Sequence, residues 1–139
     1  IGSDIVFDFD KAISFDGDTG PYIQYAYARA NSLIKEFGAG DSQNICFGFC
    51  LANPFVGRLV RTLSKYRVTM LDSASAYSPS TLCQYLFDLS QSFNAFYQNV
   101  RLSEMSEDDR GVYLVIIRAV LNVLQSGLFN LGIPIVEKM

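Results

Sequence analysis

Two long apolar stripes with a helical repeat constrain the fold of this chain more than any other feature. The first holds large apolar residues at steps of three and four over about four helical turns: Leu82, Leu86, Leu89, Phe93 and Phe96. The second follows the same steps from Leu114 to Leu131, and valines and isoleucines cover much of its remaining surface. A helix that is apolar nearly all round is expected in the middle of a bundle.

Start and stop signals divide the rest of the chain into further helices. Asn53-Pro54 and Ser78-Pro79 are N-cap and first-turn pairs, and Ser106 precedes an acidic first turn. Gly38 and Gly132 end helices. The helices are expected at 22–37, from 53 to about 66 or on through 70, at 69–76, from 79 to about 99, and from 106 to about 131. The sequence predicts an all-α helical bundle of about four or five helices, led in by a short extended segment at 5–9 and followed by an extended tail at 133–139.

Composition excludes several classes of chemistry. The 139 residues suit one domain, and they include no histidine, which excludes histidine-based catalysis and histidine-containing zinc sites within the chain. The formal net charge is -3, which argues against binding to nucleic acid by bulk charge. No serine or cysteine has beside it in the sequence a basic side chain that could activate it as a nucleophile, so no catalytic residue is expected.

Three cysteines do not form a disulfide framework or a metal site by their spacing. Cys46, Cys50 and Cys83 are expected to be buried, reduced thiols in a reducing compartment. The start at Ile1 lacks the features of a signal peptide, and the continuous apolar runs are too short to span a membrane. We therefore expect a cytoplasmic piece of a larger protein, without a membrane partner.

A group of aspartates near the N-terminus includes D-x-D spacings, which suit binding of a divalent cation through oxygen ligands. Its members are Asp4, Asp8, Asp10, Asp16 and Asp18. The calcium-loop pattern fails, and the stretch around Gly17 is ordinary turn chemistry. No metal site is expected.

Two surfaces could contact nucleic acid. Tyr22, Tyr25 and Arg29 are three and four residues apart and share one helix face, which suits stacking on unpaired bases. The residues alone favour packing at a core edge, because tyrosine packs well there. The second surface is a group of cations: Arg58, Arg61, Lys65 and Arg67. These side chains either contact phosphates or form a solvated helix face, and the sequence favours neither interpretation.

Four ordered motifs resemble those of arginyl-tRNA synthetases. They are F-D-F-D-K at 7–11, S-F-D-G-D-T-G-P-Y-I-Q-Y-A-Y-A-R at 14–29, L-C-Q-Y-L-F-D-L at 82–89 with F-N-A-F-Y at 93–97, and V-L-Q-S-G-L-F-N-L-G-I at 123–133 with V-E-K-M at 136–139. The resemblance covers most of the chain and is weakest between residues 38 and 68. Four motifs in order are far more specific than any one of them.

The resemblance implies the C-terminal part of a class I arginyl-tRNA synthetase. Residues 1–19 would be the end of the catalytic domain or a connecting segment, and residues 20–139 the helical anticodon-binding domain of the DALR type. The implied partners are the tRNA for arginine and the catalytic domain of the same chain, in a monomer. The whole enzyme would join arginine to that tRNA with ATP and magnesium. The piece lacks the H-I-G-H and K-M-S-K-S motifs, so no cofactor is expected in it.

The family also implies which residues meet the anticodon loop. Matching positions implicate Tyr22, Tyr25, Arg29, Arg101 and Met139. Tyr27 stands where family members often have histidine; tyrosine can stack there but does not ionise near neutral pH. The alternative function is a non-catalytic helical module that binds another protein through the basic helix at 58–67.

Overall fold

The structure is a computed structural model that describes residues 19–38 and 53–138. The helices are α2 (Gly20–Phe37), α4 (Pro54–Ser64), α5 (Tyr66–Ser75), α6 (Pro79–Asn99) and α7 (Glu107–Asn130), with one 3-10 turn, η1 (Leu102–Glu104). The prediction of an all-α bundle is confirmed, since the described residues contain no strand. The expected extended segment at 5–9, the acidic group at 4–18, Cys46, Cys50 and Met139 lie outside the described residues.

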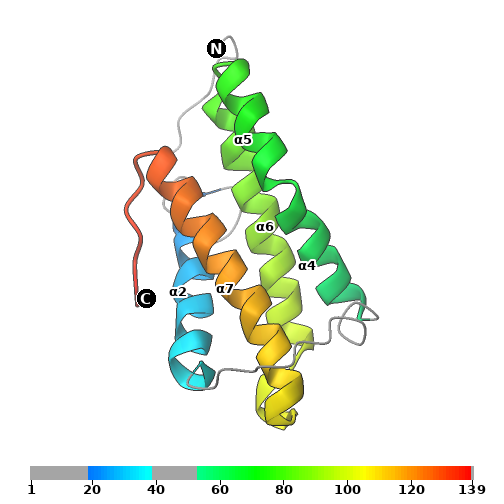
Figure 1. The fold of residues 1–139 in the computed structure, drawn as a ribbon. Coiled ribbons are helices and arrows are strands. Elements are labelled where there is room, and N and C mark those ends of the chain that lie inside the picture. The colour runs from blue at the N-terminus through cyan, green and yellow to red at the C-terminus, as the bar shows by residue number, and fades with distance from the viewer. Residues whose placement is uncertain (1–18, 39–52, 139) are drawn as a thin grey trace.

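Helix α6 is the element around which the others are arranged. It packs against α2, α4, α5 and α7, while α2 also packs along α7. In Figure 1, α2 and α7 run antiparallel on one side of α6, and α4 followed by α5 lies on the other side. The core is formed where these helices meet, and its fully buried large side chains come mostly from α6 and α7: Phe93, Phe96, Leu86, Leu89, Ile117, Leu124 and Leu128.

The predicted helix starts are confirmed by their caps. The Asn53 side-chain oxygen accepts hydrogen bonds from the backbone N–H groups of Phe55 and Val56, at 2.9 and 3.4 Å. Ser106 accepts one from the N–H of Asp109 at 3.2 Å. Helix α6 begins at Pro79 as predicted, although the Ser78 side chain makes no capping bond.

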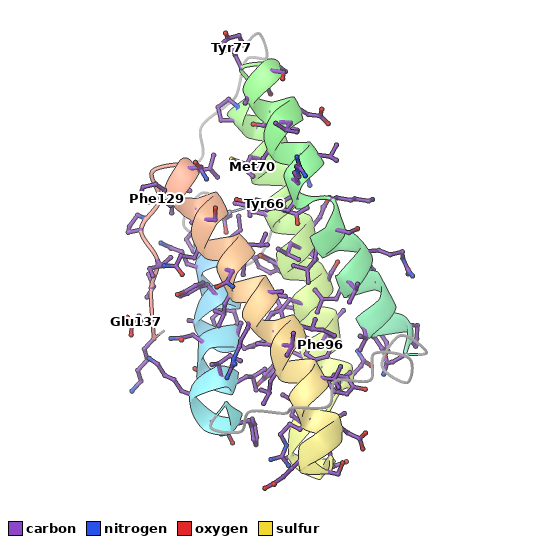
Figure 2. The ribbon with its side chains drawn as sticks, in the orientation of Figure 1. Tyr66, Met70, Tyr77, Phe96, Phe129 and Glu137 are labelled. Atoms are coloured by element: carbon purple, nitrogen blue, oxygen red, sulfur yellow. The ribbon has the colours of Figure 1, made fainter. Side chains whose placement is uncertain are left out.

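Two details of the predicted helices are wrong. Of the two ends predicted for the helix from Pro54, the one near residue 66 agrees with the structure and the one at Met70 is wrong, because α4 ends at Ser64 and a new helix begins at Tyr66. Helix α7 is not enclosed on all sides; an exposed stripe runs along it: Val115, Arg118, Asn122, Gln125 and Phe129. Phe129 is 82% exposed, and Figure 2 shows it pointing away from the bundle, whereas Phe96 lies between the helices. The apolar character of α7 therefore exceeds what the bundle covers.

Cys83 is exposed on α6, which contradicts its predicted burial. Its position falls between the buried residues Leu82 and Leu86, so the apolar stripe of that helix does not include it.

Helix α7 is also long and apolar enough to cross a membrane by length and composition, over Asp109–Asn130. Half of that window is buried inside the bundle, where it supplies much of the core against α2 and α6. A core helix has these same properties.

The fold perturbs the ionisation of Tyr85. Its side chain is buried between α6 and α4, and its hydroxyl donates a hydrogen bond to the Thr62 carbonyl at 3.1 Å. Burial raises the pKa of Tyr85 well above its ordinary value, and the neighbouring Tyr66 raises it further.

Candidate nucleic-acid interface

Helix α2 presents three different faces. Thr19 caps it by accepting a hydrogen bond from the Tyr22 N–H, and Pro21 stands in its first turn. One face is buried in the core: Ile23, Ala26, Tyr27 and Ala30. A second face holds Gln24, Asn31 and Lys35 against the C-terminal tail. The third face carries the predicted Tyr22, Tyr25 and Arg29.

On this third face the Arg29 guanidinium lies between two tyrosine rings. Its central carbon is 4.4 Å from the ring centroid of Tyr25 and 4.4 Å from that of Tyr97, which comes from α6. A guanidinium over an aromatic face is attracted to it, and here it fixes both rings. Tyr25 is 37% exposed and Tyr97 is 40% exposed, so each ring keeps accessible surface. The arrangement offers aromatic surface beside a positive charge.

The Asn94 side chain makes hydrogen bonds to both Arg29 and Tyr22. Its side-chain oxygen accepts a hydrogen bond from Arg29 Nη1 at 3.2 Å, and its side-chain nitrogen donates to the Tyr22 hydroxyl at 3.0 Å. Arg29 Nη2 also donates to the Tyr25 hydroxyl. The Tyr22 ring packs on Phe87 with centroids 5.1 Å apart, which ties the network to α6. Tyr22 is therefore connected to Arg29 through Asn94.

A groove continues from this cluster toward the end of α6. Two adjoining hollows of about 200 and 260 Å³ share Leu33, Glu36 and Tyr97 as lining residues. Tyr25 and Arg29 line the first hollow, and Arg101 lines the second. We call the two hollows together the α2–α6 groove. It brings Arg101 into one surface with Tyr25 and Arg29. Their contact with RNA stays a prediction.

Arg101 lies at the far end of the α2–α6 groove. Its guanidinium is 3.3 Å from a carboxylate oxygen of Glu104, and both side chains are largely exposed. An exposed pair of this kind contributes little to stability, so Arg101 remains accessible to a ligand at small cost. The 3-10 turn beside it is held by Arg110, which donates to the carbonyls of Leu102 and Met105 at 3.0 and 2.9 Å.

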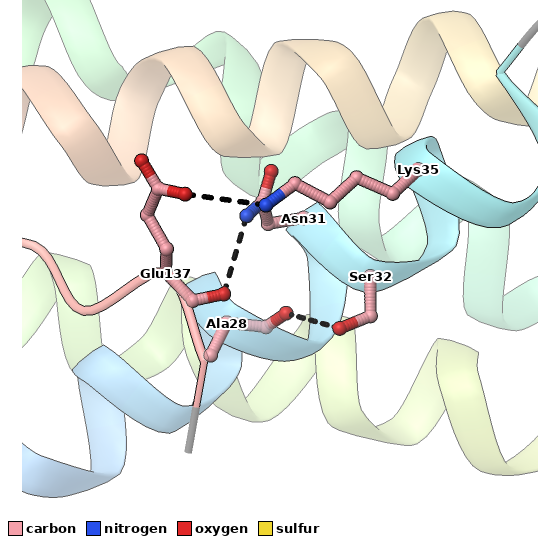
Figure 3. Close-up of polar contacts among 5 residues, drawn as sticks. All are labelled: Ala28, Asn31, Ser32, Lys35 and Glu137. Carbon is pink, nitrogen blue, oxygen red and sulfur yellow. Dashed lines mark hydrogen bonds and ion pairs between the residues drawn. The ribbon is translucent and has the colours of Figure 1, made fainter.

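The C-terminal tail runs along α2. Gln24 donates a hydrogen bond to the Pro134 carbonyl at 2.8 Å, and Asn31 donates to the Glu137 carbonyl at 3.2 Å. Figure 3 shows the second of these bonds together with the ion pair between Lys35 and Glu137, whose charged atoms are 3.2 Å apart. These contacts carry the chain toward the end of α2. Met139 follows directly but lies outside the described residues, so its predicted role stays a prediction.

The structure differs from the sequence-based expectation for Tyr27, and it adds two residues to the candidate site. Tyr27, which we expected to be able to stack on a base, is only 7% exposed and belongs to the core. Sequence reasoning missed Tyr97 and Asn94 as site residues, although both stand in the F-N-A-F-Y motif. Their spacing of three residues on one helix face was the available signal.

Comparisons with known proteins identify the family of this chain. Residues 23–139 match the family described as the DALR anticodon binding domain. The chain belongs to this family. The match confirms the predicted resemblance and the anticodon-binding class of domain.

The curated relatives that the chain matches are arginine–tRNA ligases, which are longer than this chain. The chain is 35% identical to the arginine–tRNA ligase of Synechocystis sp. over 99% of its own length and 24% of that protein. It is 37% identical to the ligase of Wigglesworthia glossinidia brevipalpis, again over 99% of the chain and 24% of the relative. The chain thus spans about a quarter of the length of the curated relatives it matches.

Solved structures show the same fold. Arginyl-tRNA synthetase of Thermus thermophilus superposes with a TM-score of 0.82 at 35% identity, over 96% of this chain and 23% of that one. The synthetase of Plasmodium falciparum superposes with a TM-score of 0.81 at 23% identity, over 99% of this chain and 24% of that one, which supports the fold alone.

Proposed function

We propose that this domain binds the tRNA for arginine at its anticodon end, within an arginine–tRNA ligase. The observation that carries the proposal is the stack of Tyr25, Arg29 and Tyr97 at one end of the α2–α6 groove. Unpaired bases of an RNA loop stack on exposed aromatic rings and hydrogen-bond or ion-pair with arginine. An anticodon loop presents such bases, and the groove has room for them between Tyr25 and Arg101.

Catalysis belongs to the part of the ligase outside this chain. Among residues 19–38 and 53–138 there is no group of three or more acidic or cysteine side chains suited to hold a metal ion. We place ATP, magnesium and the joining of arginine in the remainder of the enzyme, because the H-I-G-H and K-M-S-K-S motifs of the family are absent from this sequence. This domain contributes binding and orientation of the tRNA. We place the ligase in the cytoplasm, as a monomer whose catalytic domain precedes this one.

Binding of labelled anticodon stem-loops to the full 139-residue chain, followed by fluorescence anisotropy, tests the proposal. Tyr25→Ala is expected to weaken binding of the arginine stem-loop about fivefold to 150-fold, which corresponds to about 1–3 kcal/mol for one stacked base. Tyr25→Phe keeps the ring and is expected to bind within a few fold of the unmodified chain.

The matched control is Phe129→Ala, because Phe129 is also an exposed aromatic residue but lies on α7 away from the groove. This control is expected to leave RNA binding unchanged. Equal affinities for the unmodified chain and Tyr25→Ala would contradict the assigned face. Equal affinities for arginine and unrelated stem-loops would contradict the proposed specificity.

A further inference from the structure

A line of four cations on α4 and the start of α5 has no role in the α2–α6 groove. We call Arg58, Arg61, Lys65 and Arg67 the basic strip; all four are exposed. Within the described part of the chain, none of these side chains makes a hydrogen bond or an ion pair. From residue 54 to residue 71 the sequence contains no acidic residue, although the whole chain carries a net charge of -3. The basic strip is thus a local concentration of positive charge on an acidic protein.

The geometry of α4 points the basic strip away from the bundle. Val56 and Leu59 are fully buried on the face of α4 that packs against α6, and Arg58 and Arg61 lie on its exposed side, with the exposed Lys65 at its end and Arg67 at the start of α5. Arg58, Arg61 and Lys65 are three and four residues apart, so they form a row about 10 Å long at 1.5 Å per residue. Like charges at these spacings repel one another and destabilise the helix. A polyanion lying along the row relieves this repulsion.

We propose that the basic strip binds the sugar–phosphate backbone of RNA, as a second contact surface separate from the α2–α6 groove. Three of the four cations are arginines, whose planar guanidinium binds phosphate oxygens in a bidentate manner. Backbone contacts need only charge, and they supply sequence-independent affinity. The inference rests on the proposed function, because the RNA that reaches the strip is the one whose loop the groove binds.

The composition of the exposed face favours RNA over a protein partner. Protein interfaces have an apolar or aromatic centre surrounded by a polar rim. The exposed residues of α4 after its first position are polar or charged: Arg58, Arg61 and Ser64. Exposed apolar residues, Val68 and Leu71, begin only beyond Arg67 on α5. The row of cations therefore lacks the apolar centre that a docking helix or peptide requires.

The fold keeps the two surfaces apart. Helix α2 lies beside α7 on one side of α6, and α4 lies on the other side (Figure 1). The groove and the basic strip therefore contact different segments of an RNA. Substitutions in the strip should change overall affinity and its salt dependence, while substitutions in the groove should change discrimination between RNAs.

The test compares the full 139-residue chain with the triple variant Arg58→Gln, Arg61→Gln, Lys65→Gln. Affinities for the arginine tRNA and for an unrelated tRNA are measured at several KCl concentrations. The triple variant is expected to bind both RNAs at least about tenfold more weakly. The plot of log association constant against log salt concentration has a negative slope, and its magnitude should decrease by about one for each cation removed. The melting temperature of the triple variant should not fall, because like charges have been removed from one helix face.

The double variant Arg58→Lys, Arg61→Lys is the matched control, since it keeps the charge; its salt slope should equal that of the unmodified chain. Unchanged RNA affinity and slope in the triple variant overturn the inference, while discrimination between tRNAs by the unmodified chain still supports the proposed function. Conversely, loss of binding in the triple variant without any discrimination supports the basic strip and overturns the proposed function.

Polyglutamate serves as the probe for an acidic protein partner. If the triple variant loses affinity for polyglutamate but keeps its affinity for both tRNAs, the strip binds a protein and the inference is wrong. If the unmodified chain binds neither tRNA at low salt, both the inference and the proposed function are wrong.

Discussion

The substitution Asn94→Asp separates the position of Arg29 from its charge. Aspartate has nearly the shape of asparagine, and its carboxylate accepts a hydrogen bond from Arg29 where the asparagine oxygen does, at 3.2 Å. The Tyr22 hydroxyl, which accepts from Asn94 at 3.0 Å, is able to rotate and donate to the second carboxylate oxygen. The network behind Arg29 therefore stays connected while a negative charge is added beside the guanidinium.

The expected effects on stability and on RNA binding have opposite signs. A partly exposed ion pair adds about 0–1 kcal/mol, so the free energy of unfolding should be kept or slightly raised. Two unit charges 4 Å apart interact by about 1 kcal/mol in water and about 4 kcal/mol near a protein surface. A phosphate on the far side of the guanidinium is roughly twice as distant, so repulsion by the new carboxylate should cost about 0.5–2 kcal/mol. Binding should weaken about twofold to thirtyfold.

Thermal unfolding and anisotropy with the arginine anticodon stem-loop measure the two effects. Asn94→Ala is the companion variant: it removes both hydrogen bonds, so it should lower the free energy of unfolding by about 1–2 kcal/mol. The binding penalty of Asn94→Asp should shrink at high salt, because added ions screen the repulsion. If Asn94→Asp keeps both its stability and its RNA affinity at low salt, the charge of Arg29 does not face the RNA and the reasoning is refuted.

Two further predictions concern the fold that supports the site. Gly127→Ala should destabilise the protein by about 0–2 kcal/mol, because the added methyl group would lie 2.5 Å from a Leu86 methyl in a fully buried contact, and this overpacking exceeds the helix-propensity gain of about 1 kcal/mol. Gly20→Ala, where nothing lies within 4 Å, is the control and should be neutral or stabilising in the same chemical-denaturation series. Above pH 10 the unfolded chain releases the Tyr85 proton while the folded chain retains it, since burial raises the pKa of Tyr85 in the fold. This group's contribution to stability is therefore complete below pH about 10 and falls as the pH rises further, by at most about 1.4 kcal/mol per pH unit. Tyr85→Phe should show a shallower fall than the unmodified chain between pH 10 and 11, and parallel curves would contradict the assignment.

Local signals in the sequence were sufficient to place the helices. Asn53 and Ser106 cap as predicted because an N-cap acts on the two or three residues that follow it, all of which are visible in the sequence. The two ends predicted for the helix from Pro54, near residue 66 and near residue 70, could not be distinguished, since no glycine or proline stands between them. The exposure of Phe129 also could not be predicted, because an apolar stripe shows which residues can be buried but not whether a neighbouring helix covers them.

The candidate site was predictable only where it lies on one helix. Tyr25 and Arg29 share a face of α2 through their spacing, and this is why the sequence brought them together. Asn94 reaches Arg29 across 65 residues of sequence, and Tyr97 follows it on the same face of α6. Which residues of α6 oppose α2 depends on the packing of the two helices, and a single sequence does not contain that register.

Helix α2 links every part of the candidate site, and this has a consequence for how the site works. Its core face fixes the helix against α6 and α7, its second face holds the tail through Gln24 and Asn31, and its third face carries Tyr25 and Arg29. A shift of α2 would therefore displace the groove and the tail together. The buried Tyr27 opposes such a shift, because it anchors the helix in the core. The geometry presented to an RNA loop is thus determined largely by the packing of this one helix, which makes core substitutions along α2 as relevant to RNA affinity as substitutions in the groove itself.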